Sequence, residues 1–328
     1  MPDLHQWLET LWWTKQPPLP LRLLSRLYYA ISRRHLRQRA ARAVEPPLPL
    51  ISVGNITAGG SGKTPFVIWL AAELRLHGYA PVILCRGDGG ASGEPTLIAA
   101  HHPAGEVGDE ARLLFERSGC PVIAGRDRLK ASRMAAGLGN VIILDDGFQY
   151  RQLGRCCDIV LIPAEGVGNG QLIPAGPLRE PIEALKRADI IVRTGNDDAR
   201  PLQQEKPEWH WQTRTAGLRD AMHTGAGVPT VCMAATGIAR PKRFLDDLHA
   251  SGLIVDQSRL FPDHYRFGRE DVATLLAASL PVVVTGKDAV KLAPLWPADV
   301  PLWILEQEPV EAMDLLENIL DRLPELGS

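Results

Sequence analysis

The sequence is poor in cysteine and has no pattern that would pair its thiols or bind zinc. Its 328 residues include five cysteines, and none of them belongs to a C-x-x-C pair. An odd, unpatterned set is typical of reduced thiols in a cytosolic protein, and it argues against a disulfide framework or a zinc site. We expect the thiols to fill the core. They are Cys85, Cys120, Cys156, Cys157 and Cys232.

Long apolar runs are also missing. No run approaches the roughly 20 residues that a membrane-spanning helix needs, and the N-terminus lacks the apolar centre of a signal peptide. With 45% hydrophobic and 23% charged residues, the chain has the composition of a soluble globular protein, which excludes disordered and fibrous classes. Its length suggests two domains.

Acidic residues are absent from residues 15 to 44, although this segment holds eight lysines and arginines. On a helix over residues 18–40, the stripe of Arg22, Arg26, Arg33 and Arg37 lies opposite a face with Leu21, Leu24, Tyr28 and Ile31. Trp7, Trp12 and Trp13 precede the helix. Basic residues, an apolar face and nearby aromatic rings favour a helix lying on an anionic membrane surface. A helix packed on its own domain and a nucleic-acid patch are the alternatives.

The stretch SVGNITAGGSGKTP, residues 52–65, departs by one residue from the phosphate-loop pattern G-x-x-x-x-G-K-[ST]. An apolar run precedes it and a helical pattern follows it, so the order is strand, loop, helix. The backbone N–H groups of residues 58–64 are predicted to surround phosphates, with the lysine on the β/γ-phosphates and the threonine on Mg²⁺. A structural turn is the alternative. The predicted nucleotide-binding residues are Thr57, Ala58, Gly59, Gly60, Ser61, Gly62, Lys63 and Thr64.

Apolar runs then alternate with helical stretches. The runs are continuous rather than alternating, which is typical of a parallel sheet covered on both faces. We predict a doubly wound α/β, P-loop NTPase-like N-terminal domain with a second, smaller α/β domain. The predicted divisions are a membrane-associating segment at 1–45, the P-loop domain at 46–195, a linker that can include a strand or two at 196–228, and the smaller domain at 229–328.

Four further residues carry candidate chemistry. Asp145 and Asp146 end an apolar run, where a strand meets the edge of an open α/β sheet that binds ligands, so at least one is predicted to bind a metal. Asp109 precedes a helix, and taken alone it is better explained as the cap of that helix. His264 lies in a polar loop, where a lone histidine is more often solvated than catalytic.

Taken together, eight motifs give the chain a specific resemblance, which extends from about residue 51 to 292. They are VGNITAGGSGKTP, CRGDGG, GDE, GRDR, DDGFQ, GNGQLIPAGPLRE, DH and TGKDAVK. In this order they resemble the tetraacyldisaccharide 4'-kinases, the lipid A 4'-kinases. That family's phosphate loop carries threonine at the position of Thr57, so the missing glycine is a family trait.

The resemblance implies ATP and Mg²⁺, and as acceptor the 4'-hydroxyl of a tetraacylated glucosamine disaccharide 1-phosphate, giving lipid IV-A. It also implies peripheral attachment to the cytoplasmic face of the inner membrane. We expect no nucleic-acid partner and infer no obligate protein partner. The rival hypothesis is a nucleotide-switch ATPase acting on a partner protein. Its deviant loop reads K-G-G-x-G-K-[ST], and Ala58 occupies the position of the signature lysine here.

The resemblance also implies roles for individual residues. Asp109 is the expected base near the acceptor hydroxyl, assisted by His264. The other expected catalytic residues are Lys63 and Asp146. The expected metal ligands are Thr64, Asp145, Asp146 and Glu180, and the expected substrate contacts are Arg179, Arg86 and Asn55, with Arg126 and Gln149 as weaker candidates. The chain departs from the family at Asp88, where a tyrosine is usual, and at Gly286, where a glutamate is usual. The first departure puts a substrate contact in doubt.

Overall fold

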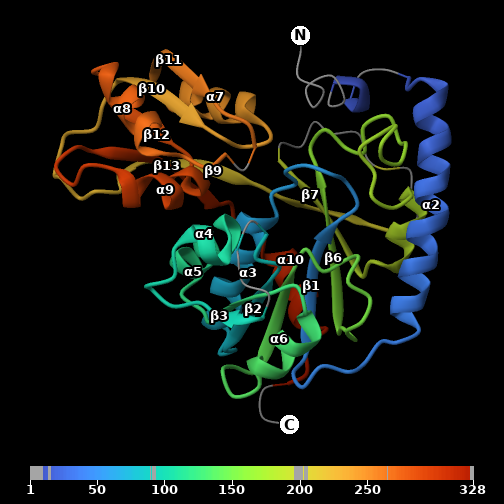
Figure 1. Cartoon of the computed structure of the whole chain (residues 1–328). Coiled ribbons are helices and arrows are strands. Elements are labelled where there is room, and N and C mark those ends of the chain that lie inside the picture. The colour runs from blue at the N-terminus through green and yellow to red at the C-terminus, as the bar shows by residue number, and fades with distance from the viewer. Residues whose placement is uncertain are drawn as a thin grey trace.

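The computed structural model describes residues 10–13, 16–88, 90, 94–195, 202, 206–263 and 265–325. Two sheets form two domains, and a long helix lies along the outside of the larger one (Figure 1). In the described part of the chain, no helix is both long and apolar enough to cross a membrane.

The larger sheet has eight strands in the order β3-β4-β2-β5-β1-β6-β7-β8. All neighbours run parallel except the edge strand β3. The strands are β1 (Leu50–Asn55), β2 (Pro81–Cys85), β3 (Thr96–Leu97), β4 (Val122–Ala124), β5 (Val141–Asp145), β6 (Cys157–Pro163), β7 (Ile190–Thr194) and β8 (Glu208–Trp211). Its helices are α3 (Lys63–Leu76), α4 (Ala104–Val107), α5 (Asp109–Ser118), α6 (Arg128–Ala135) and the 3-10 helix η1 (Ile182–Arg187).

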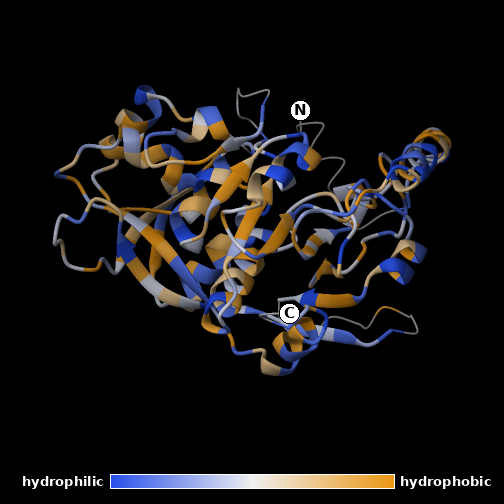
Figure 2. Ribbon diagram, turned by 90° about the horizontal axis from the view of Figure 1, so that it is seen from below, coloured by the Kyte–Doolittle hydropathy of each residue, from blue (hydrophilic) through white to orange (hydrophobic). Residues whose placement is uncertain are grey.

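The central strands are mostly apolar and fully buried, because helices or loops cover both faces of the sheet. Successive side chains of a strand point to opposite faces, so Ile51 packs with α3 and α5 while Leu50 packs with α6. Figure 2 shows the hydrophobic strands in the interior. This is the covered parallel sheet predicted from the continuous apolar runs.

The smaller sheet has the order β11-β10-β12-β13-β9, and only its edge strand β9 is antiparallel to its neighbour. The strands are β9 (Thr213–Asp220), β10 (Val231–Thr236), β11 (Ile254–Leu260), β12 (Val282–Val284) and β13 (Leu302–Pro309). The helices are α7 (Pro241–Ala250), α8 (Arg269–Ala277), α9 (Gly286–Leu292) and the 3-10 helix η2 (Ala293–Leu295).

The chain crosses between the domains twice. The segment predicted as a linker contains β8, which ends the larger sheet, and β9, which begins the smaller one; residues 196–201 and 203–205 lie outside the described residues. The last helix, α10 (Met313–Leu320), returns to the larger domain, where Leu315, Leu316 and Ile319 join the core under α3. The smaller domain is therefore inserted between β8 and α10.

Helix α2 (Leu19–Ala40) matches the predicted basic helix and packs along one side of the larger domain. Its inward face carries Ser25 and Tyr28, which bond to the loop that follows β6. Ser25 Oγ donates to the Leu172 carbonyl at 2.7 Å, and Tyr28 Oη donates to the Arg179 carbonyl at 3.0 Å. The helix therefore supports this loop.

Replacing Ile319 by alanine tests whether α10 packs in the core of the larger domain. The side chain is fully buried in the larger core. We expect the unfolding free energy to fall by about 2 to 4 kcal/mol, the usual loss for such a truncation. Chemical denaturation followed by the fluorescence of the core residues Trp69 and Trp211 measures it. Glu317→Ala, on the exposed face of α10, is the control, and equal midpoints for the two variants would contradict the packing.

Candidate active site

The phosphate loop joins β1 to α3 and is held open by side chains around it. Gly62 has φ 76°, a left-handed conformation that suits glycine, and α3 begins at the next residue, Lys63. Asn55 Nδ2 donates to Ser61 Oγ at 2.9 Å, and Thr194 Oγ1 donates to the Ser61 carbonyl at 3.0 Å. The loop thus presents a helix N-terminus, which favours an anion.

The start of the loop explains why threonine replaces the first glycine. Residues 56–58 run beside residues 177–179, and Thr57 forms a bridge with Leu178 in an extended conformation that needs no glycine. Ala58 N–H donates to the Pro177 carbonyl at 2.6 Å. This differs from the prediction for residues 58–64, because the Ala58 N–H is bonded to protein rather than free for a phosphate.

Two carboxylates stand beside this loop because β5 is the neighbour of β1 and ends at the same edge of the sheet. Asp146, at φ 51°, lies 3.3 Å from Lys63 Nζ and 3.1 Å from Arg179 Nη1. Burial raises the pKa of Asp146, but the Lys63 ammonium and the Arg179 guanidinium outweigh it and hold the pKa well below its usual range. Asp146 is therefore an anion that keeps both cations at the loop.

The pKa of Asp145 is shifted in the opposite direction. Burial, followed by the nearby Glu110 carboxylate, raises the pKa of Asp145 to about 7. Its Oδ1 is buried and has no hydrogen-bond partner, while its main-chain carbonyl accepts from Arg128 at 3.1 Å. Unpartnered buried oxygens are rare, so this carboxylate is suited to a cation that the protein itself does not supply.

A second polar group surrounds Glu180. Gln149 Nε2 donates to the Asn55 carbonyl at 2.9 Å and to Glu180 Oε1 at 3.2 Å. Arg187 Nη2 donates to both oxygens of Glu180, at 3.1 and 2.9 Å. Both oxygens thus accept hydrogen bonds from the protein, which distinguishes Glu180 from the unpartnered Oδ1 of Asp145; metal binding by Glu180 stays a prediction.

Asp109 begins α5 and does not cap it, contrary to the capping alternative. Gly108 occupies the capping position at φ 97°. The Asp109 carboxylate lies 3.6 Å from Lys291 Nζ of α9, and the neighbouring Glu110 lies 3.1 Å from Lys287 Nζ. Lys291 is held in turn by the fully buried Asp288 at 3.2 Å. Two lysines of the smaller domain therefore face the two carboxylates of the larger one.

One predicted substrate contact pairs outside this group. Arg86 Nε lies 3.1 Å from Asp88 Oδ1, so the residue that replaces the family tyrosine is paired with a predicted substrate contact. His264 lies outside the described residues, and its predicted pairing with Asp109 is not tested. Among the described residues, no group of three or more His, Cys, Asp and Glu side chains is arranged to hold a metal by itself.

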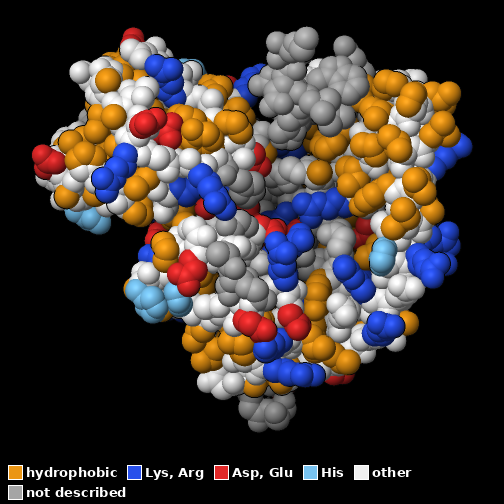
Figure 3. Space-filling view, in the orientation of Figure 1, with side chains coloured by type: hydrophobic (Ala, Val, Ile, Leu, Met, Phe, Trp, Pro, Cys, Tyr) orange, Lys and Arg blue, Asp and Glu red, His pale blue; other side chains and the backbone are white. Residues whose placement is uncertain are grey.

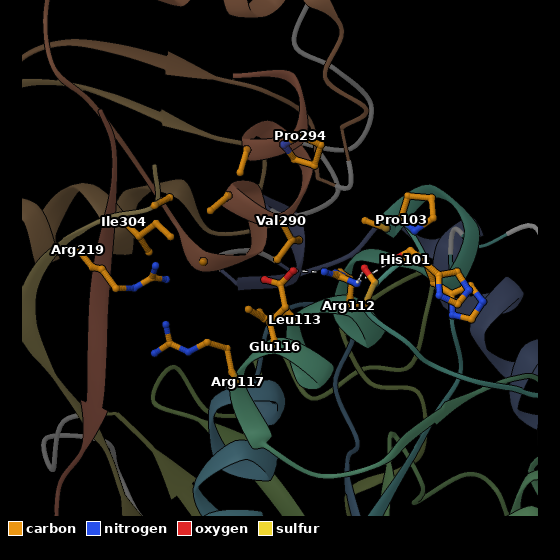
Figure 4. A pocket seen from close by; sticks show the side chains of 17 residues that line it. His101, Pro103, Arg112, Leu113, Glu116, Arg117, Arg219, Val290, Pro294 and Ile304 are labelled. Carbon is orange, nitrogen blue, oxygen red and sulfur yellow. Dashed lines mark hydrogen bonds and ion pairs between the residues drawn. The ribbon is translucent and has the colours of Figure 1, made fainter. Parts of the chain in front are cut away.

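A cavity of about 420 Å³ also lies between the domains, but no phosphate-loop residue lines it (Figure 4). Arg117 and Arg219 point into it, and both bond to Glu306, at 2.5 to 2.7 Å. The three charges tie α5 to β13 and β9. This cavity belongs to the contact between the domains rather than to the candidate site.

Sequence reasoning assigned no role to most of the charged residues of the domain contact. Glu110 belongs to the quoted motif GDE, and Lys287 and Lys291 belong to the quoted motif TGKDAVK, so the motifs were a usable signal. Arg117 and Arg219 gave no such signal. Figure 3 shows Lys and Arg side chains gathered in the hollow between the domains.

Comparisons with known proteins agree with this geometry. The family described as Tetraacyldisaccharide-1-P 4'-kinase matches residues 18–324. A tetraacyldisaccharide 4'-kinase of Azoarcus sp. (strain BH72) is 38% identical over 313 residues, which are 93% of this chain and 90% of that protein. A protein of the same name from Thiobacillus denitrificans is 38% identical over 328 residues, which are 95% of this chain and 97% of that protein.

A solved structure confirms the predicted fold class. It is a crystal structure of LpxK from Aquifex aeolicus in complex with ATP, which superposes with a TM-score of 0.74 at 27% sequence identity. The match covers 92% of this chain and 98% of that chain.

Replacing Asp145 by asparagine gives a pH-dependent gain in stability. The pKa of Asp145 rises from 3.8 to about 7 on folding. The contribution of this carboxyl group to the unfolding free energy is therefore fully present below pH 3.8 and is lost as the pH rises through about 7. We expect Asp145→Asn to raise the unfolding free energy by about 2 to 4 kcal/mol at pH 8 and by little below pH 4. Denaturation of both proteins in a metal chelator measures this, and the same difference at the two pH values would contradict it.

Proposed function

Because the chain belongs to the tetraacyldisaccharide 4'-kinase family, we propose that it uses ATP to phosphorylate the 4'-hydroxyl of a tetraacylated glucosamine disaccharide 1-phosphate, giving lipid IV-A. The observation that carries the proposal is the Lys63, Asp146 and Arg179 group at the mouth of the phosphate loop. Phosphoryl transfer depends on positioning and charge neutralisation, and these residues supply both.

The reaction exchanges one bond to phosphorus for another. The 4'-oxygen forms a bond to the γ-phosphorus, the bond from that phosphorus to the bridging oxygen of ADP breaks, and the hydroxyl proton passes to a carboxylate. We assign this base to Asp109, which Lys291 holds at the domain boundary, and we keep His264 as the predicted assistant.

Mg²⁺ fits the residues at the end of β5. It prefers oxygen ligands and takes only one or two carboxylates beside the phosphates of a nucleotide, so a larger protein cluster is unnecessary. Thr64 with Asp145 or Asp146 would hold it, because Asp145 Oδ1 is buried without a partner. When bound, the ion neutralises charge on the phosphates. Lys63 and Arg179 are placed to hold the phosphates from the protein side, with Arg86 and Asn55 as further candidate substrate contacts.

We also propose that α2 places the enzyme on the cytoplasmic face of the inner membrane. Its inward residues pack on the larger domain, yet its apolar outward residues are exposed to solvent. The exposed apolar residues are Leu19, Leu23, Leu24, Leu27 and Ile31. Arginines flank this stripe, as on helices that lie at an anionic lipid surface. In Figure 3 the hydrophobic and basic side chains gather on the side where α2 lies.

The kinase assignment is tested by incubating the protein with labelled ATP and the disaccharide 1-phosphate. We expect a bis-phosphorylated product, and a loss of at least about 10²-fold in Lys63→Ala because a phosphate contact is removed. Release of inorganic phosphate with no labelled lipid would favour the nucleotide-switch ATPase instead. Salt-sensitive nucleic-acid binding is not expected.

The membrane assignment is tested by vesicle sedimentation. Leu23 and Leu27 are 55% and 57% exposed on α2. Replacing both by serine is expected to weaken binding to anionic vesicles at least about tenfold, because burying each leucine contributes more than about 1 kcal/mol. The control is serine at Ile254 and Leu260, which are 61% and 52% exposed in the smaller domain. Equal binding by the two double variants would refute the role of α2.

A further inference from the structure

Arg240 of the smaller domain reaches across to the phosphate loop of the larger one. It lies between β10 and α7, at the capping position of α7. Its Nη1 donates to Glu165 Oε2 at 2.6 Å, and its guanidinium carbon lies 4.9 Å from the centre of the Trp13 ring. Glu165 follows β6, which is the neighbour of β1 and ends at the same edge of the sheet. The guanidinium is therefore held at the edge where the phosphate loop begins.

The second nitrogen of this guanidinium points at the loop. A Cβ built on Gly59 would lie 3.9 Å from Arg240 Nη2. Gly59 has φ 91°, so it is one of the positions where the loop requires glycine. In the described part of the chain, Nη2 donates to no other group, whereas Nη1 is taken by Glu165. Within the guanidinium group, Nη1 is thus fixed by an ion pair, and Nη2 is available to donate beside the loop.

We propose that Arg240 is a catalytic residue that contacts the transferring phosphoryl group of ATP, supplied by the second domain of the same chain. The proposal rests on the kinase function argued above. Negative charge is spread over the three outer oxygens of that group in the transition state, and an arginine delivered from outside the phosphate loop stabilises it in other phosphate-loop enzymes. Lys63 comes from the helix that follows the loop, so Arg240 adds a cation from a separate element.

A purely structural role explains the contact less well. Glu165 is half exposed, and exposed ion pairs contribute little to stability. Stacking on Trp13 and pairing with Glu165 fix the orientation of the guanidinium, which is the preorganisation that a phosphate contact needs. Arg240 and Lys291 both belong to the smaller domain. The position of that domain therefore governs both the contact to the transferring phosphoryl group and the contact to Asp109, the proposed base at the acceptor hydroxyl.

Kinetics of four full-length variants test the proposal. In Arg240→Ala we expect kcat to fall at least about 10²-fold while KM for ATP stays within about threefold, and Arg240→Lys should recover only part of the loss because a lysine lacks the fork. Lys242→Ala, which removes an exposed cation from the next turn of the chain, is the matched control and should keep the wild-type rate. Glu165→Gln removes the ion pair but leaves Arg240 in place, so its loss should be within about tenfold.

Equilibrium binding supplies a readout that does not depend on turnover. The probe is ADP with aluminium fluoride, which imitates the transferring group, compared with ADP alone. Wild type should bind the fluoride complex more tightly than ADP, and Arg240→Ala should lose this gain while its affinity for ADP is unchanged.

Two results would overturn the role of Arg240. One is a kcat for Arg240→Ala within threefold of the kcat for Lys242→Ala, together with binding of ADP and aluminium fluoride that is still tighter than the binding of ADP alone. The other is a loss in Glu165→Gln as large as in Arg240→Ala, because the residue would then serve only to link the domains. Failure of the kinase assignment itself looks different, since the wild-type protein would make no bis-phosphorylated product.

Discussion

The candidate site depends on one partly buried charge group, in which Asp146 holds Lys63 and Arg179 at the mouth of the phosphate loop. Each partner comes from a different part of the chain, namely the end of β5, the start of α3 and the loop after β6. Two cations brought close together would repel each other, and the carboxylate between them removes that cost. The low pKa of Asp146 means that the anion persists over the whole physiological range.

The same arrangement connects the site to the outer surface of the protein. The loop that carries Arg179 bonds to α2 on one side and to the start of the phosphate loop on the other. Tyr28 donates to the Arg179 carbonyl, and the Arg179 N–H donates to the Ile56 carbonyl at 2.7 Å. Helix α2 is therefore part of the support of the site as well as the proposed contact with lipid. This gives a physical reason for a helix with one face hydrogen-bonded to the protein and an apolar face that is exposed.

Several pairs of charged side chains join the two domains. Lys287 and Lys291 face α5, Arg240 faces Glu165, and Glu306 joins Arg117 to Arg219. Such contacts are more easily broken and remade than an apolar interface, because water and salt compete for each charge. The return of α10 to the larger core adds an apolar attachment between the two domains. An enzyme that must admit both a nucleotide and a lipid-linked sugar requires that kind of boundary.

Much of the fold and part of the site follow from local sequence. Continuous apolar runs predict covered parallel strands, and the strand, loop and helix around GGSGKTP predict the phosphate loop, since both patterns depend on neighbouring residues. Asp145 and Asp146 could be placed at the same edge because parallel strands end together. Their opposite pKa shifts could not be predicted, because they depend on tertiary surroundings: Asp146 is paired with two cations, whereas burial, followed by the nearby Glu110 carboxylate, raises the pKa of Asp145.

The tertiary structure alone decided the features that rest on distant contacts. Strand β8 and helix α10 lie on either side of the smaller domain in the sequence. Both belong to the larger domain, because β8 pairs with β7 and α10 fills the core under α3. Glu180 is engaged by Arg187 and Gln149, which no local pattern indicates. Arg240 lies 181 positions beyond Gly59 in the chain yet stands beside it. Sequence determines periodicity and turn chemistry, which are local, whereas the pairing of charges depends on which surfaces the completed fold brings together.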